Sequence, residues 1–440
     1  MNSSIINKTK FLLICLVFLF LTTDSWASTI NVDGVTCNLH DAITAANTNQ
    51  AVGGCSSGQA GEDYLILPVN GNILLSTVLP LIEDILVIEG NGTTIARDPQ
   101  ASNFEIFYLN FASVTINDAI ITGGYPRAPE FIDGGGIYAL GSTLYLNRTQ
   151  LIGNFGTGLV IYGSSLVMVD SVIADNVGIK EQPSYSAGLS IVNIDNTGAG
   201  GYYRIVRSTI ANNINSNRGA VYCYHCNNVR IISSTISGNV NVSGSGGAVE
   251  VIGRTHATIN EVSSVVGLYN STIINNSTTA AQAVGGAFYS LRGAVSAFGS
   301  IVSNNQSMTD IEAFHDPDTQ IDFPGSIIKY SLLGLNGNFN STGYIPNMTD
   351  MILTDSDLSN VLNPELTNNG GYTPTYKLTP TSPAIDFDGD ENCWINFYPL
   401  GEFSQNGLLR NIDGNGDGTA ECDAGAYEYQ DIIFADGFEL

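Results

Sequence analysis

The sequence is poor in charge, and poorest in positive charge. Only 13% of the 440 residues are charged, and 41 acidic residues stand against 15 basic ones, which gives a formal net charge of −26. Nucleic acids and anionic lipid surfaces are bound through basic patches. The shortage of Lys and Arg therefore argues against both, and we expect no nucleic-acid partner.

Long apolar runs are also missing, apart from one near the N-terminus. Phe11 to Leu21 is an apolar run of eleven residues that follows Lys8 and Lys10. It is too short to span a bilayer comfortably, and Ser25-Trp26-Ala27 carries small residues where a signal peptidase cleaves. The sequence predicts a signal peptide over 1–27, with an uncleaved anchor as the alternative. We expect export by the general secretory route and no transmembrane segment in the mature chain.

Cysteine is scarce, and its spacing is local. Of seven cysteines, Cys15 belongs to the signal peptide. The other six form three neighbouring couples: Cys37 and Cys55, Cys223 and Cys226, Cys393 and Cys422. In an oxidising compartment we expect each couple to be a disulfide. Cys223, His225 and Cys226 also allow a metal or redox interpretation, but a structural zinc site needs four ligands, so the disulfide is favoured.

Glycine (48 residues) and apolar residues (43%) are abundant, so the chain can bury a core and is not a disordered acidic tail. Seven segments repeat an apolar strand followed by a polar corner, usually Asn. They lie 22 to 37 residues apart, at Ile120, Leu151, Ile173, Ile210, Ile236, Ile273 and Val302. Such a period of short strands with Gly and Asn corners is typical of a solenoid, whose coils bury their apolar residues only by stacking.

This pattern predicts an all-β fold, a right-handed single-stranded parallel β-helix. We expect three strands per coil and about nine or ten coils spaced by about 4.8 Å. The corner Asn tolerates left-handed backbone angles, and its amide can bond the matching Asn of the next coil. A β-propeller needs longer repeats, of about 40 to 50 residues.

These repeats resemble those of bacterial polymorphic outer membrane proteins and of pectate-lyase-like β-helices. The segment Cys37 to Asn47 is similar to one that opens many exported bacterial β-helix proteins, with His40-Asp41 in place of the usual basic-acidic pair. The C-terminus resembles the choice-of-anchor domain of the Q type, through stretches around Ser382, Gln405, Arg410, Asp413 and Cys422 to Glu428. It departs from that family at Ser404-Gln405-Asn406-Gly407, where D-Q-R-G is usual. The resemblance implies an exported protein of a Gram-negative bacterium, secreted or held at the outer surface.

The ends of the solenoid have their own signals. Leu39, Ala42, Ile43 and Ala46 predict a short capping helix with Asn38 as its N-cap. The last ten residues alternate and resemble the I-F-x-D-G-F-E endings of many exported proteins of Gram-negative bacteria. The resemblance implies a sorting or processing role, and a final edge strand on the cap is the alternative. The expected organisation is 1–27 signal peptide, 28–100 N-terminal cap and first coils, 101–310 β-helix repeats, 311–360 late coils, 361–430 C-terminal cap and 431–440 tail.

An acidic motif in the C-terminal cap raises the question of calcium. Asp413, Asn415 and Asp417 alternate with glycine, as in the first half of a calcium loop, but Ala424 occupies the position of the bidentate Glu. A tight turn rich in left-handed positions accounts equally well for these alternating Asp, Asn and Gly residues. Calcium that locks the cap and a bare turn are the two open interpretations.

A cluster of Tyr and Arg in the repeats is the candidate ligand site. Aromatic rings stack on sugars and Arg pairs with carboxylates, so a strip of both residues suits glycan binding. Its members are Tyr202, Tyr203, Arg204, Arg207, Tyr222 and Arg230. The alternative is that these are Arg side chains that solvate the strand faces.

No catalytic constellation is recognisable, and the acids of the repeats are scattered. Three function classes remain, each on an exported β-helix. A non-enzymatic protein that binds glycans or cell surfaces along its lateral face is favoured. A polysaccharide lyase or glycoside hydrolase is the first alternative and a structural spacer the second. The identity of the ligand and the oligomeric state stay open.

Overall fold

The structure is a computed structural model. It describes residues 27–127, 134–179, 186–193, 201–253, 264–307, 314–315, 327–339, 341–342, 346–354, 357–387, 393 and 402–430. The predicted signal peptide and the C-terminal tail lie outside these residues, apart from Ala27. None of the described helices is long and apolar enough to cross a membrane.

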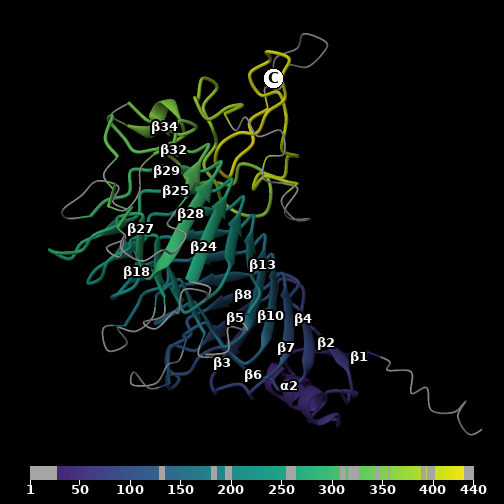
Figure 1. Cartoon of the computed structure of the whole chain (residues 1–440). Coiled ribbons are helices and arrows are strands. Elements are labelled where there is room, and N and C mark those ends of the chain that lie inside the picture. The colour runs from purple at the N-terminus through teal and green to yellow at the C-terminus, as the bar shows by residue number, and fades with distance from the viewer. Residues whose placement is uncertain are drawn as a thin grey trace, which may run out of the picture.

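Three long parallel sheets make up most of the described chain (Figure 1). Sheet 1 contains β1 (Ser28–Asn31), β2 (Glu62–Ile66), β4 (Ile85–Glu89), β7 (Ser113–Asn117), β10 (Thr143–Asn147), β13 (Ser165–Val169), β16 (Tyr203–Val206), β20 (Val229–Ile232), β24 (Ser264–Tyr269), β28 (Gly293–Phe298) and β31 (Ile328–Lys329). Sheet 2 contains β3 (Asn72–Leu75), β5 (Thr94–Arg97), β8 (Ile120–Thr122), β11 (Gln150–Ile152), β14 (Val172–Ala174), β17 (Thr209–Ala211), β21 (Thr235–Ser237), β25 (Thr272–Ile274), β29 (Ile301–Ser303), β32 (Leu332–Leu333) and β34 (Met351–Ile352). Sheet 3 contains β6 (Phe107–Asn110), β9 (Ile137–Leu140), β12 (Leu159–Tyr162), β15 (Leu189–Val192), β19 (Val221–Tyr224), β23 (Val249–Ile252), β27 (Phe288–Leu291), β30 (Phe314–His315) and β33 (Ser341–Thr342). A short fourth sheet at the corner between sheets 2 and 3 contains β18 (Ile214–Asn215), β22 (Val240–Asn241) and β26 (Ser277–Thr278).

From β4 to β33 the chain visits the three sheets in turn, so each of these coils contributes one strand to each sheet. Strands β10, β11 and β12 form one such coil, and β13, β14 and β15 form the next, with every pairing between them parallel. This is a parallel β-helix with three strands per coil, as predicted. Sheet 1 has eleven described strands. Sheet 3 begins only at β6 and has nine, so nine of the described coils contribute a strand to every sheet, in agreement with the nine or ten coils predicted.

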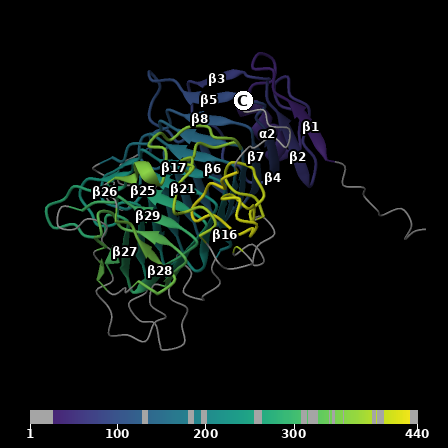
Figure 2. The same cartoon turned by 90° about the horizontal axis from the view of Figure 1, so that it is seen from above.

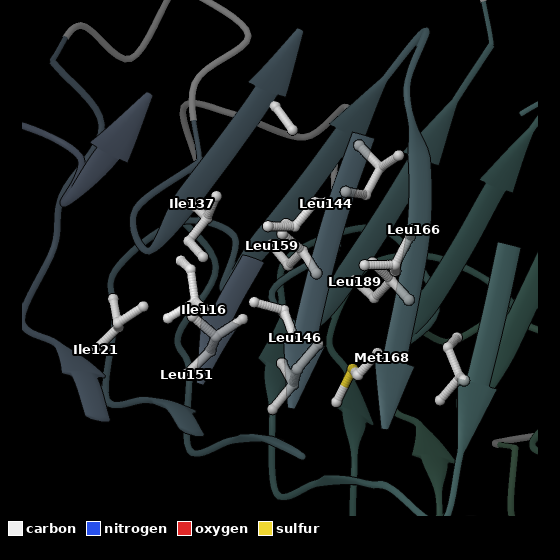
Figure 3. Packing of buried hydrophobic residues seen from close by; sticks show 14 of the residues in the cluster. Ile116, Ile121, Ile137, Leu144, Leu146, Leu151, Leu159, Leu166, Met168 and Leu189 are labelled. Atoms are coloured by element: carbon white, nitrogen blue, oxygen red, sulfur yellow. The ribbon is translucent and has the colours of Figure 1, made fainter. Parts of the chain in front are cut away.

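The interior is filled by columns of apolar side chains, one above another along the axis (Figure 3). On sheet 1 the register places Leu144 against Leu166 and Leu146 against Met168. All four side chains are fully buried, because alternate residues of a strand face the core. Each coil covers the apolar edge of its neighbour, and this explains why the repeats fold only as a stack.

A ladder of buried asparagines lines the corner between sheets 2 and 3. The side-chain nitrogen of each donates to the side-chain oxygen of the next, at 2.8 to 3.1 Å, through Asn154, Asn176, Asn213, Asn239, Asn276 and Asn305. The predicted coil-to-coil bonding is confirmed. The left-handed backbone angle belongs instead to the preceding residue, for example Asp175 at φ 56° and Asn212 at φ 55°. The sequence analysis assigned both the left-handed angle and the coil-to-coil hydrogen bond to the same Asn, whereas two neighbouring residues supply them.

Helix α2 (Leu39–Thr48) covers the N-terminal end of the core, as predicted. The Asn38 side chain caps it by accepting from the Asp41 N–H, and Leu39, Ala42, Ile43, Ala45 and Ala46 are buried. Asn49 ends the helix in the left-handed conformation. The helix therefore shields the apolar interior of the first coils from water.

The C-terminal region, 357–430, begins near the 3₁₀ turn η2 (Leu358–Asn360) and lies along the side of the β-helix (Figure 2). Tyr376, Ala424 and Tyr429 cluster with Ile274 of β25 and Ile301 of β29. Polar contacts reach β17 and β21 as well. The sequence suggested a plug for the far end, whereas the described contacts cover the outer face of sheet 2.

The three cysteine couples are joined as expected, in the disulfides Cys37–Cys55, Cys223–Cys226 and Cys393–Cys422. The first joins the segments before and after α2, and the third lies within the C-terminal region. Cys223 occupies a core position on β19, level with Ile191 and Val251 of the neighbouring coils. Both sulfurs of the Cys-Tyr-His-Cys motif are thus used in a buried bridge.

Candidate functional site

The outer face of sheet 1 brings together three of the predicted site residues. Arg204 and Arg230 lie side by side in the register of β16 and β20. The Arg204 guanidinium lies 4.1 Å from the centre of the Tyr202 ring, which is 54% exposed. Arg204 is itself buried, with its Nη1 2.8 Å from the Tyr203 carbonyl oxygen. Tyr202 is therefore an exposed platform held from below by a cation.

Arg230 is the more accessible of the two cations. It is partly exposed, and its Nε donates to Asn228 Oδ1 at 2.8 Å. Arg204 Nη1 also lies 3.3 Å from the carbonyl oxygen of Asn228. The residue before β20 therefore holds both guanidinium groups, which fixes the spacing between the platform and the accessible charge.

More aromatic residues extend this face in both directions. Tyr145 on β10 is 40% exposed, and Tyr269 and Phe298 on β24 and β28 stack at 5.4 Å between ring centres. From β10 to β28 the face spans five strand spacings, or about 24 Å. The sequence analysis missed these three residues because their common face emerges only from the register.

The charge of this face changes along the axis. The strands of sheet 1 from β10 to β31 contain no Asp or Glu, whereas β2 and β4 contain Glu62 and Glu89. Arg204, Arg230 and Lys329 belong to the acid-free part. In a chain with a net charge of −26, these strands therefore carry positive charge only.

The remaining members of the predicted strip lie elsewhere. Tyr203 points into the core between Leu166 and Val229, and burial raises its pKa to about 12. Arg207 sits at the corner between sheets 1 and 2, where it is paired with Asp170 at 2.8 Å. Tyr222 is on the outer face of sheet 3. The six residues are neighbours in sequence but do not form one surface.

A second cluster surrounds Tyr222 on sheet 3. Glu250 lies next to Tyr222 in register, and its carboxylate contacts Arg218 Nη1 at 2.8 Å and the Gly219 N–H at 3.1 Å. The Arg218 guanidinium is 4.8 Å from the Tyr222 ring centre. The sequence placed Glu250 and Arg218 among scattered charges, because they are 32 residues apart and meet only across one coil.

The electrostatics of this cluster depend on burial. Glu250 is 2% exposed, and desolvation raises its pKa to about 7 despite the adjacent Arg218. Burial raises the pKa of the Tyr222 hydroxyl as well. Glu105, Arg127 and Tyr108 repeat the same arrangement near the start of sheet 3. The cluster thus holds a proton-accepting carboxyl, but one described carboxyl is not the pair that glycoside hydrolysis requires.

The proposed calcium motif forms a hydrogen-bonded loop. Asp413 accepts from the N–H groups of Gly416 and Gly418 at 2.7 and 2.9 Å, and Asn415 and Asp417 each accept from the residue two positions on. The carboxylate of Asp386 accepts from Gly414 and Asn415. Across the described residues no three His, Cys, Asp or Glu side chains are grouped as metal ligands. These oxygens hold a turn, and calcium stays a prediction.

The residues that resemble the choice-of-anchor domain have a structural task. Gln405 Nε2 donates to Thr209 Oγ1 on β17 at 2.8 Å, and its Oε1 accepts from Thr235 on β21 at 2.6 Å. Arg410 is fully buried, where it contacts Glu428 at 3.3 Å and Ser233 at 3.1 Å. Burial raises the pKa of Glu428. The motif fastens the C-terminal region to the side of the helix.

In a comparison with known proteins, no family model and no curated protein matches the sequence. The geometry therefore carries the functional argument alone.

Proposed function

We propose that this protein is an exported β-helix that binds acidic glycans on the outer face of sheet 1 and does not cleave them. The observation that carries the proposal is the set of Tyr202, Arg204 and Arg230 on two adjacent coils, in strands without Asp or Glu. An exposed ring stacks on a sugar face, and a guanidinium pairs with a carboxylate. Uronic-acid polysaccharides offer both features in one repeating chain.

The three residues have different tasks in this proposal. Tyr202 and Arg230 contact the ligand, whereas Arg204 positions the Tyr202 ring from beneath. Tyr145 on one side, and Tyr269 with Phe298 on the other, lengthen the platform. A face of about 24 Å suits several sugar units in a row, so affinity should rise with the length of the oligosaccharide.

The test is calorimetric titration of the mature chain, 28–440, with uronic-acid and neutral oligosaccharides. Arg230→Gln should weaken binding of the acidic ligands by about tenfold to a hundredfold, the range of one charged hydrogen-bonding pair. Arg148→Gln is the matched control, because Arg148 lies at the corner after β10 and is paired with Asp118 at 2.6 Å. Equal binding of neutral and acidic ligands, or equal losses in both variants, would refute the proposal.

The same ligands decide between binding, cleavage and a spacer. Unsaturated products or new reducing ends after incubation would establish a lyase or a hydrolase instead. Neither binding nor turnover on a broad set of polysaccharides would leave the structural spacer. Export is tested separately, by N-terminal sequencing of the protein from the culture medium or the outer-membrane fraction.

A further inference from the structure

The corner that leads from sheet 3 into β20 differs from its counterparts in three earlier coils. Two residues separate the strands at those corners, 111–112, 141–142 and 163–164, whereas four residues, 225–228, separate β19 from β20. Each corner begins with a left-handed residue, such as Phe111 at φ 53° and His225 at φ 54°. Asn228 adds a second left-handed residue at φ 57°, which the three shorter corners lack. Asparagine tolerates this conformation better than most residues, so the longer corner ends on a suitable residue type.

A disulfide closes the longer corner. Cys226 is its second residue and is fully buried, while the serines at the same place in two earlier corners, Ser142 and Ser164, are 4% and 3% exposed. There the Ser164 hydroxyl oxygen accepts from the Ser142 N–H at 2.8 Å. Cys226 is joined instead to Cys223, at a core position of β19. The bridge therefore fixes the beginning of the corner and leaves 227–228 as a two-residue extension.

The last residue of this extension lies on the candidate binding face. Asn228 is exposed. Asn228 and Tyr202 directly precede the first register partners of β20 and β16, so the two residues lie side by side. The Asn228 side-chain oxygen accepts from Arg230 Nε at 2.8 Å, and its carbonyl oxygen lies 3.3 Å from Arg204 Nη1. A single corner residue thus contacts both cations of the face and adjoins its exposed ring.

The acceptor that holds Arg230 is neutral, which is not the case for two other arginines of sheet 1. At the corner between sheets 1 and 2, two guanidinium groups also donate through Nε, but to carboxylates: Arg148 to Asp118 at 2.7 Å and Arg207 to Asp170 at 2.8 Å. A carboxylate orients a guanidinium and also cancels its charge, whereas an amide oxygen orients it and adds no charge. The contact with Asn228 therefore directs Arg230 without neutralising it.

We propose that Asn228 is a positioning residue that makes the outer face of sheet 1 selective for anionic sugars, and that the Cys223–Cys226 disulfide holds the corner that carries it. This inference rests on the proposed function, because it names the residue that orients the accessible cation. A uronic-acid unit that stacks on the Tyr202 ring would present its carboxylate to Arg230, which Asn228 keeps beside that ring. Selectivity thus depends on a corner residue as well as on the strands.

Calorimetric titration of the mature chain, 28–440, with a uronic-acid oligosaccharide and a neutral one of equal length tests the proposal. Asn228→Asp keeps the shape of the side chain but pairs Arg230 with a carboxylate. It should lower the affinity for the acidic ligand about tenfold or more and change that for the neutral ligand less than about twofold. Asn228→Gly keeps the left-handed backbone but removes the acceptor, and it should lower the affinity for the acidic ligand about fivefold to tenfold. Asn212→Asp is the matched control, because Asn212 is an exposed left-handed residue after β17 of sheet 2.

A measurement without ligand separates the positioning of Arg230 from glycan binding. A phenylglyoxal reagent modifies arginine side chains, and mass spectrometry of the peptides gives the rate at each site. Reaction at Arg230 should be faster in Asn228→Gly than in the mature chain and unchanged in Asn212→Asp. Equal rates in all three proteins would show that Asn228 does not hold this guanidinium, and the proposal would fail whatever the ligand does.

The disulfide is tested by Cys223→Val together with Cys226→Ser. Val is the residue type of Val251, the neighbour of Cys223 in β23, and Ser is the type found in the shorter corners. At a temperature well below unfolding, this double variant should bind the acidic ligand more weakly than the mature chain. Cys37→Ser with Cys55→Ser, which removes the distant disulfide beside α2, should bind it equally well. Unchanged affinity in the corner variant would refute the role of the bridge.

The titrations also distinguish failure of this inference from failure of the proposed function. If Arg230→Gln loses affinity for the acidic ligand while both Asn228 variants bind like the mature chain, the positioning role is wrong and the binding face stands. If the mature chain binds no acidic oligosaccharide, both proposals are wrong.

Discussion

Sheets 1 and 3 both present arginine and tyrosine on their outer faces, in opposite electrostatic settings. On sheet 1, Arg230 is partly exposed in a stretch of strands without Asp or Glu. On sheet 3, Arg218 is paired at 2.8 Å with Glu250, which is 2% exposed. The same residue types thus leave a charge near the solvent on one face and neutralise a buried acid on the other. Neighbouring charges, rather than composition, set the two faces apart.

The largest expected effect comes from breaking the pair on sheet 3. Arg218→Met should destabilise the protein by about 3 to 5 kcal/mol at neutral to alkaline pH, because it leaves a buried carboxylate without its counter-ion. At acidic pH the loss should be much smaller, since Glu250 then takes up a proton. Thermal unfolding at both pH values measures this. Arg230→Met on sheet 1 is the control and should cost at most about 1 kcal/mol at either pH. An Arg218→Met loss that does not vary with pH would contradict the assignment.

The second prediction isolates the acid itself. The pKa of Glu250 is raised from 4.5 to about 7, so its protonated form is favoured in the folded state. Its contribution to stability is complete below the unfolded value of 4.5 and is lost as the pH rises through about 7. Glu250→Gln should therefore flatten the pH dependence of unfolding in this window by about 3 kcal/mol. An unchanged slope would mean that Glu250 stays ionised throughout.

The third prediction compares the two sides of sheet 1. Tyr202→Leu removes the exposed ring over Arg204 and should weaken acidic-glycan binding by about fivefold, the value of about 1 kcal/mol for such a stack. Tyr203→Phe removes only a hydroxyl inside the core and should leave binding unchanged. Titration with one oligosaccharide measures both variants. A loss of binding in Tyr203→Phe would show that the face depends on the core packing beneath it.

The smallest effect concerns calcium. Direct pairing of arginine with carboxylate needs no bridging cation, so a chelator should leave binding on sheet 1 unchanged. Calcium that locks the C-terminal region would instead raise its unfolding temperature, and Asp413→Asn with Asp417→Asn would abolish that rise. Calorimetry with calcium and with chelator separates the two cases. Glycan binding that requires calcium would contradict the arginine mechanism.

The repeating parts of this structure were readable from the sequence. The spacing of the corner asparagines predicted coils of three strands, and the ladder from Asn154 to Asn305 confirms the bonding they were expected to make. Leu39, Ala42 and Ile43 predicted α2, and three cysteine couples predicted three disulfides. These features depend on residues near one another in sequence or on a period that the sequence displays.

The candidate site was readable only in part. The sequence analysis placed Tyr202, Arg204 and Arg230 in one strip, and the structure brings them close together, because Arg204 and Arg230 occupy the same position of successive repeats. Tyr203 and Tyr222 were added because they are close in sequence, yet one faces the core and the other a different sheet. Tyr145, Tyr269 and Phe298 were missed because they are far apart in sequence and share a face only through the register of the strands.

The sequence alone determined the class of fold, because alternation, period and corner chemistry are local properties that each coil repeats. Only the tertiary structure decided where the C-terminal region lies. The contacts of Gln405 and Arg410 with β17, β21 and Ser233 join residues 170 to 196 positions apart, and no local pattern in the sequence predicts them. The register of the coils likewise decided that Arg218 meets Glu250 while Arg230 faces outward. In a stacked solenoid the surroundings of a side chain come from the neighbouring coils. Because the loops between the strands differ in length, the sequence alone does not show which residues of two coils are aligned.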